Sequence, residues 1–101
     1  MDETPDGLLV DPPDQLRAFI SHGRITTMPA KRSKRLVVLD YAATLFEIGV
    51  HYPELEVNSS LRAVFDDYVA LRRYLVDEGF LARANGEYWR SGGTVEIETA
   101  P

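Results

Sequence analysis

Positive charge is concentrated at one place in this chain, the segment Lys31-Arg32-Ser33-Lys34-Arg35, which we call the basic cluster. Cations at this density can contact phosphates, and each neutralised phosphate adds to an affinity that falls as salt rises. An apolar run from Leu36 to Phe46 follows, so the basic cluster stands at the start of an expected helix, where it opposes the helix dipole. The cluster therefore predicts phosphate contact. The alternative is a solvated basic flank, or one that pairs with the acidic N-terminal residues.

Further candidate contacts are three arginines later in the chain. Arg73 falls on the outward face of an expected helix, and Arg83 and Arg90 fall on the two arms of an expected hairpin. A helix and hairpin of this kind can reach the major groove and the backbone of DNA. The helix face also carries Asp67 and Asp77, a poor match to phosphate, so the alternative for Arg73 is an ordinary solvated arginine. The candidate DNA-binding residues are Lys31, Arg32, Lys34, Arg35, Arg73, Arg83 and Arg90.

Arg72 has a different expected role, because it falls on the apolar face of the same helix. A buried charge without a partner is strongly destabilising. We therefore expect Arg72 to form a structural ion pair with a carboxylate, and the candidates are Glu54, Glu56 and Asp66.

Catalytic chemistry has few residues to carry it. The chain has no cysteine, its only imidazoles are His22 and His51, and no metal-ligand spacing is present. It also lacks a glycine-rich phosphate loop. The sequence therefore predicts no enzyme, no cofactor and no metal site.

The net charge of -5 at first sight disfavours a DNA-binding protein, but the acids are concentrated at the ends. Residues 15–95 carry all 11 Lys and Arg against 9 acids, which is +2 and permits a polyanion partner. No apolar run approaches the roughly 20 residues of a membrane span, and the acidic N-terminus lacks signal-peptide features. We expect no membrane contact and a soluble cytoplasmic protein.

The hydrophobic pattern and its breakers predict an α+β fold with a C-terminal hairpin. Four helices are expected near residues 13–22, 32–47, 58–65 and 67–78, and a hairpin at 80–90. Asn85-Gly86 closes the hairpin with a two-residue turn, which pairs Arg83 with Tyr88 and Ala82 with Trp89.

Two details complete this prediction. Residues 54–57 are expected to be extended, with Asn58 as the N-cap of the third helix. Ile25 and its neighbours are the expected third strand. The order of helix, turn, helix and hairpin predicts a winged helix-turn-helix over residues 13–91. Residues 1–12 are an expected flexible acidic segment, and residues 92–101 an expected flexible tail.

Two blocks of sequence carry a resemblance to a known family. These are Pro29 to Arg35 and Tyr52 to Asn58, supported by Leu71-Arg72-Arg73 and Tyr88-Trp89-Arg90. Over about residues 15–90 the chain resembles the bacterial domain of unknown function 2087. In that family the domain occurs alone and fused behind helix-turn-helix regulators, so the resemblance implies a transcription-associated role. It implies no enzymatic activity.

The predicted function is that of a DNA-binding or transcription-regulator-associated domain, with duplex DNA as partner. The alternative is a protein-interaction or small-effector-sensing module on the same scaffold, because a fold alone does not fix function. The apolar excess of helix 32–47 favours the alternative, and makes that helix the expected surface of a homodimer.

Overall fold

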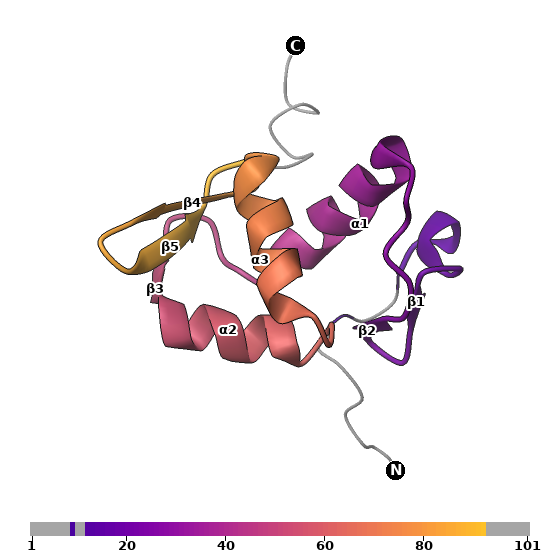
Figure 1. Ribbon diagram of the computed structural model, residues 1–101, viewed down its shortest axis with the longest axis horizontal. Helices are drawn as coiled ribbons and strands as arrows, with labels where there is room; N and C mark the ends of the chain where they lie inside the picture. The colour runs from indigo at the N-terminus through magenta and orange to yellow at the C-terminus, as the bar shows by residue number, and fades with distance from the viewer. Residues whose placement is uncertain (1–8, 10–11, 93–101) are drawn as a thin grey trace.

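Three α-helices and two small antiparallel sheets form a mixed α+β fold in the part of the chain that the structure describes (Figure 1). This computed structural model describes residue 9 and residues 12–92, so the expected segments 1–12 and 92–101 lie mostly outside the described residues. In chain order the elements are a 3-10 turn at Asp14–Leu16, β1 (Ile20–Ser21), β2 (Arg24–Ile25), α1 (Arg32–Ala43), β3 (His51–Pro53), α2 (Glu54–Arg62), α3 (Tyr68–Asp77), β4 (Leu81–Ala84) and β5 (Glu87–Arg90).

The three-stranded sheet contains the predicted hairpin. Its strand order is β3-β5-β4, and both pairs are antiparallel. Asn85 and Gly86 have φ angles of 55° and 80°, as a type I′ turn requires. The predicted partners Arg83 and Tyr88 face each other in the register, as do the alanine and tryptophan at 82 and 89. The hairpin and its register are therefore confirmed.

The predicted third strand is wrong. β3 pairs with β5, whereas Ile25 pairs with Ile20 in a separate two-stranded sheet. The loop after α1 brings β3 back beside the hairpin. The three residues His51-Tyr52-Pro53 have no local pattern that predicts a strand. Strand pairing between distant segments depends on the packed fold rather than on the short sequence itself.

The predicted helix at 13–22 is also wrong, because the chain makes a single turn there and then a hairpin. His22 and Gly23 have φ angles of 55° and 76°, and this two-residue turn places Ile20 opposite Ile25. Both isoleucines are buried, so the packing of two β-branched side chains prevails over the short helical pattern.

α2 begins at Glu54, so residues 54–57 are helical and the expectation of an extended segment is wrong. Pro53 occupies the N-cap position, and Glu54 and Glu56 fall in the first turn, where the helix dipole favours carboxylates. Asn58 consequently lies inside the helix rather than at its N-cap.

α3 agrees closely with its predicted range, and its two ends show why. The Asp67 carboxylate accepts a hydrogen bond from the backbone N–H of Ala70 at 3.1 Å. At the other end Gly79 has a φ of 84°, and the Phe80 N–H donates to the Leu75 carbonyl at 2.8 Å. This is a Schellman C-cap, the geometry that glycine makes possible.

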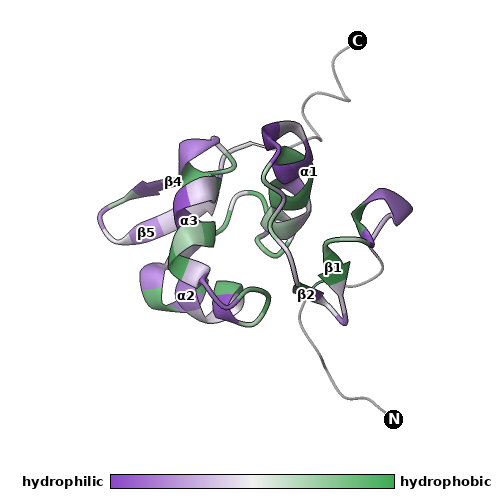
Figure 2. Ribbon diagram, turned by 45° about the vertical axis from the view of Figure 1, so that its right-hand side comes forward, coloured by the Kyte–Doolittle hydropathy of each residue, from purple (hydrophilic) through white to green (hydrophobic). Residues whose placement is uncertain are grey.

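α1 begins as predicted and ends at Ala43, short of the expected residue 47. The N–H groups of Thr44, Leu45 and Phe46 each donate to the carbonyl three residues earlier, so the helix tightens into 3-10 geometry there. The start of α1 is hydrophilic and much of the rest is hydrophobic (Figure 2). No helix in the described residues has the length and hydropathy needed to span a membrane.

The core lies among the three helices and the inner face of the three-stranded sheet. Its largest fully buried side chains are Tyr88, Phe46, Leu39, Leu61, Leu71, Leu75, Val38, Val57 and Val64. Leu71 and Leu75 fix one face of α3 against this core, so the opposite face of α3 is directed to solvent.

Candidate functional site

A groove lies between the outer face of α3 and the β4–β5 hairpin. Its volume is about 410 Å³, and we call it the arginine groove because three arginines line it. The lining residues are Val69, Arg72, Arg73, Val76, Asp77, Arg83 and Tyr88. Asp77 is the one carboxylate among them, so the groove has an excess of positive charge.

Helical spacing explains how α3 supplies most of the arginine groove. Val69, Arg73 and Val76 are separated by four and three residues, so they follow one face of the helix. Arg73 is exposed and Val69 is 44% exposed. This face is directed away from the core because Leu71 is fully buried on the other side.

Arg83 enters the arginine groove from β4. Its register partner is Tyr88, and the Arg83 guanidinium carbon lies 5.6 Å from the centroid of the Tyr88 ring, a cation–π contact. Burial raises the pKa of the Tyr88 phenol, and the hydrogen bond that it donates to Glu54 Oε1 at 3.0 Å raises this pKa further. The phenol therefore stays neutral and fixed in place, and the Arg83 side chain packs against its ring.

Arg72 lines the arginine groove and is half-buried, and its Nη1 donates to the amide oxygen of Asn58. The structure thus gives Arg72 an amide partner where a carboxylate was expected. Glu54 accepts from Tyr88, and Asp66 pairs with Arg24 at 2.6 Å. Asn58 reaches α3 because it lies within α2, a placement that the sequence pattern did not predict.

The third candidate partner, Glu56, is exposed on α2. None of the three expected carboxylates therefore forms an ion pair with Arg72 within the described residues.

The four cations of the basic cluster fall into two groups. The two arginines contact residues of α3 or its C-cap, and the two lysines are exposed. Arg32 forms a bidentate ion pair with Glu78, with Nη2 2.6 Å from Oε1 and Nε 3.1 Å from Oε2. This hydrogen bonding raises the pKa of Arg32 and lowers the pKa of Glu78. Arg35 lies 5.0 Å from the centroid of the Tyr74 ring and donates to the Ala30 carbonyl at 2.9 Å. The two arginines thus hold the start of α1 against the end of α3.

The remaining members of the basic cluster, Lys31 and Lys34, are exposed. They lie at the start of α1, and in Figure 1 this end of α1 and the tip of the hairpin are on opposite sides of the molecule. In Figure 2 the start of α1 and the tip of the hairpin also lie apart. The basic cluster therefore does not join the hairpin arginines in one continuous strip.

Arg90 is also separate from the arginine groove. Its side chain is half-buried, and Nη1 donates to the Phe46 carbonyl at 3.4 Å. Of the seven candidate contacts, the structure brings Arg73 and Arg83 together and adds Arg72, which the sequence assigned to a structural role. The helical spacing of residues 69, 72, 73 and 76 indicates that they lie on one side of α3. The sequence did not indicate that the hairpin lies beside them.

In the described part of the chain, no group of three or more His, Cys, Asp or Glu side chains is placed so that it could hold a metal ion. The fold and the site together define a small α+β domain with an arginine-lined groove between a helix and a hairpin. The chain belongs to the domain of unknown function 2087 family, described as uncharacterized proteins conserved in bacteria, whose family model matches residues 24–90. The resemblance seen in the sequence is thus confirmed. No curated protein and no solved structure matches the chain.

Proposed function

We propose that the chain is a winged helix-turn-helix domain that binds duplex DNA through the arginine groove. The order of elements supports this proposal. It runs α1, β3, α2, α3 and then the β4–β5 hairpin, and β3 pairs with β5, the second strand of that hairpin. In this arrangement α2 and α3 are the helix-turn-helix, α3 is the recognition helix and the hairpin is the wing.

One observation carries the proposal, which is that Arg72, Arg73 and Arg83 line the same groove from the recognition helix and the wing. Arginine is suited to this position because its planar guanidinium binds phosphate, and guanine edges, in a bidentate manner. Arg73 and Arg83 are exposed and are the contacts, whereas Arg72 is held by Asn58 and sets the positive potential beneath them.

α3 has ten residues, about 15 Å of helix, which is enough to place one exposed face in a major groove. Val69 and Val76 on that face offer apolar contact to thymine methyl groups. The proposed role is DNA recognition associated with transcription regulation, and it assigns no catalysis to the chain.

The experiment compares two double variants that each remove two positive charges. Arg73→Ala/Arg83→Ala alters the arginine groove, and Lys31→Ala/Lys34→Ala alters exposed lysines at the start of α1. Binding to mixed-sequence duplex DNA is measured by fluorescence anisotropy at low salt. We expect the groove variant to lose at least about tenfold in affinity, and the lysine variant to stay within about threefold of the wild type.

Equal losses in the two variants would show that net charge alone governs binding. An unaltered wild-type signal at about 100 μM protein, the weak end of non-specific DNA binding, would refute the proposed function itself.

A further inference from the structure

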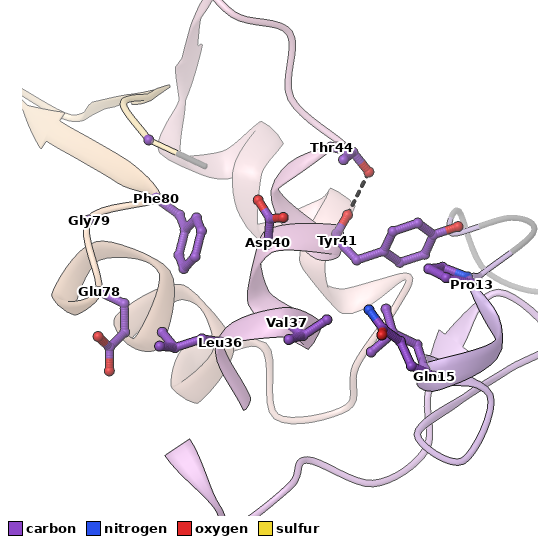
Figure 3. Close-up of a pocket in the computed structure, with 12 residues that line it drawn as sticks. Pro13, Gln15, Leu36, Val37, Asp40, Tyr41, Thr44, Glu78, Gly79 and Phe80 are labelled. Atoms are coloured by element: carbon purple, nitrogen blue, oxygen red, sulfur yellow. Dashed lines mark hydrogen bonds between the residues drawn. The ribbon is translucent and has the colours of Figure 1, made fainter. Parts of the chain in front are cut away.

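The C-terminal end of α3 carries two consecutive carboxylates, and only the second has a side-chain partner within the described residues. Glu78 forms the bidentate ion pair with Arg32, and it lines a separate cavity of about 630 Å³ that α1 also borders (Figure 3). Asp77 is exposed and lines the arginine groove. Its side chain makes no hydrogen bond or ion pair in the part of the chain that the structure describes.

Fold stability does not explain a carboxylate at position 77. Asp77 is the last residue of α3, where the partial negative charge of the helix end disfavours an anion. The other charged residues of the arginine groove are three arginines, and none of them pairs with Asp77 within the described residues. In the proposed complex with DNA, this carboxylate also repels the phosphates. A favourable contact with the DNA has to offset these costs.

The chemistry of a carboxylate restricts what that contact is. An ionised carboxylate only accepts hydrogen bonds, so its partner on the DNA is a donor. Phosphates and deoxyribose offer no donor along the duplex. The donors that the bases present in the major groove are the amino groups of cytosine N4 and adenine N6.

Cytosine fits a carboxylate better than adenine does. Adenine N7 is an acceptor that lies beside N6 on the same base edge, so it repels a carboxylate, whereas cytosine N4 has no such neighbour on its own base. We propose that Asp77 is a specificity-determining residue that accepts a hydrogen bond from cytosine N4. The inference rests on the proposed function, and it names the base that the arginine groove selects.

Helix geometry places Asp77 beside the residues that hold the DNA. Arg73 lies four residues earlier, one helical turn and about 6 Å along the axis, and both residues line the arginine groove. Stacked base pairs are about 3.4 Å apart, so Arg73 and Asp77 contact the DNA within about two base pairs of each other. Arg73 and Arg83 supply the affinity, and Asp77 supplies the choice of base.

The experiment selects duplexes from a library with a randomised central segment and sequences the bound fraction. It is run with the full chain as wild type, Asp77→Asn and Asp77→Ala. We expect the wild type to enrich cytosine at one position by at least about fivefold over each other base, as one base contact provides.

The two variants give different results if Asp77 contacts the base. Asparagine both donates and accepts, and it pairs with adenine N6 and N7, so Asp77→Asn should change the preferred base from cytosine to adenine. Asp77→Ala should enrich no base at that position. It should also bind mixed-sequence duplex about threefold more tightly, because a charge that repels phosphate is lost. Glu47→Gln, which removes an exposed carboxylate outside the arginine groove, should keep the cytosine preference.

A change in the DNA tests the same contact without a change in the protein. The selected cytosine is replaced by 2-pyrimidinone, a base of the same shape that lacks the N4 amino group. This replacement should weaken binding of the wild type by about fivefold or more, and it should leave the affinity of Asp77→Ala unchanged.

Three results would overturn the inference and leave the proposed function intact. They are a wild type that binds DNA without enriching cytosine, an Asp77→Asn variant that keeps the cytosine preference, and an unchanged affinity of the wild type for the 2-pyrimidinone duplex. A wild type that binds no duplex at about 100 μM protein would refute the inference and the proposed function together. The two failures are therefore distinguishable.

Discussion

Gly92 shows how little space separates the end of the hairpin from the end of α3. A Cβ atom at this position would lie 2.5 Å from the Gly79 carbonyl oxygen. The neighbouring Ser91 hydroxyl donates to that same oxygen at 2.9 Å, and its N–H donates to the Phe80 carbonyl at 2.9 Å. The residues after β5 are thus fastened to the C-cap of α3, and this contact fixes the hairpin beside the helix.

Gly92→Ala should therefore destabilise the fold by about 1–3 kcal/mol, because the added methyl group meets backbone rather than a side chain that can move. The measurement is the midpoint of urea unfolding. Ser91→Ala is the comparison, since it removes one hydrogen bond without adding volume and should cost about 1 kcal/mol. A Gly92→Ala variant as stable as the wild type would show that the two segments are not packed as described.

At the scale of elements, two side-chain contacts join the start of α1 to the end of α3. The Arg32–Glu78 ion pair is one, and the stacking of Arg35 on Tyr74 is the other. The Glu78 side chain is only 17% exposed, whereas that of Arg32 is 65% exposed. Because arginine keeps its charge at every pH at which the protein is folded, the Glu78 carboxylate is the member of the pair whose ionisation changes with pH.

This pair should make stability depend on pH in the acid range. The Arg32 hydrogen bond lowers the pKa of Glu78 below its ordinary 4.5, so ionised Glu78 favours the folded chain. The contribution is fully present above pH 4.5 and is lost as the pH falls through the lowered pKa. Glu78→Gln should therefore melt at a lower temperature than the wild type near neutral pH, and the difference should shrink in acid.

The control for that experiment is Asp77→Asn, which removes the adjacent, exposed carboxylate. Its effect on the melting temperature should not follow the same acid dependence. A Glu78→Gln difference that persists unchanged at low pH would contradict the assigned ion pair.

The elements that could be predicted from the sequence are those with local signals at both ends. Asp67 and Gly79 bound α3, and Asn85-Gly86 sets the hairpin register, so propensity and packing agree there. The 3-10 turn and the β1–β2 hairpin replaced an expected helix because Ile20 and Ile25 are paired by burial. β3 could not be predicted either, since its strand character depends on β5, more than thirty residues away in the sequence.

At the scale of the whole molecule, the distribution of charge decides how DNA would be bound. The acids at the chain ends leave a body of residues 15–95 with 11 Lys and Arg against 9 acids, which is +2. The sequence predicted these arginines as DNA contacts. It did not predict which of them would bind acceptors within the protein and which would line the arginine groove. Arg32 and Arg90 have acceptors within the protein, whereas Arg73 and Arg83 share the arginine groove.

This partition predicts a shallow salt dependence for DNA binding. Two or three phosphate contacts correspond to a slope of about −2 to −3 for the logarithm of affinity against the logarithm of salt concentration. A surface that also used the basic cluster would give about −5 or steeper. Anisotropy titrations over a series of salt concentrations measure the slope, and a steep value would show that the basic cluster takes part.

The β4–β5 hairpin meets the C-cap of α3 at both of its ends. Gly79 and Phe80 lead directly from α3 into β4, and Ser91 after β5 donates hydrogen bonds to the carbonyls of these same two residues. The backbone positions of Arg73 and Arg83 are thus held relative to each other before any partner is present. A proposed site that is arranged in advance in this way loses little backbone entropy on binding, so its affinity does not carry the cost of ordering a loop.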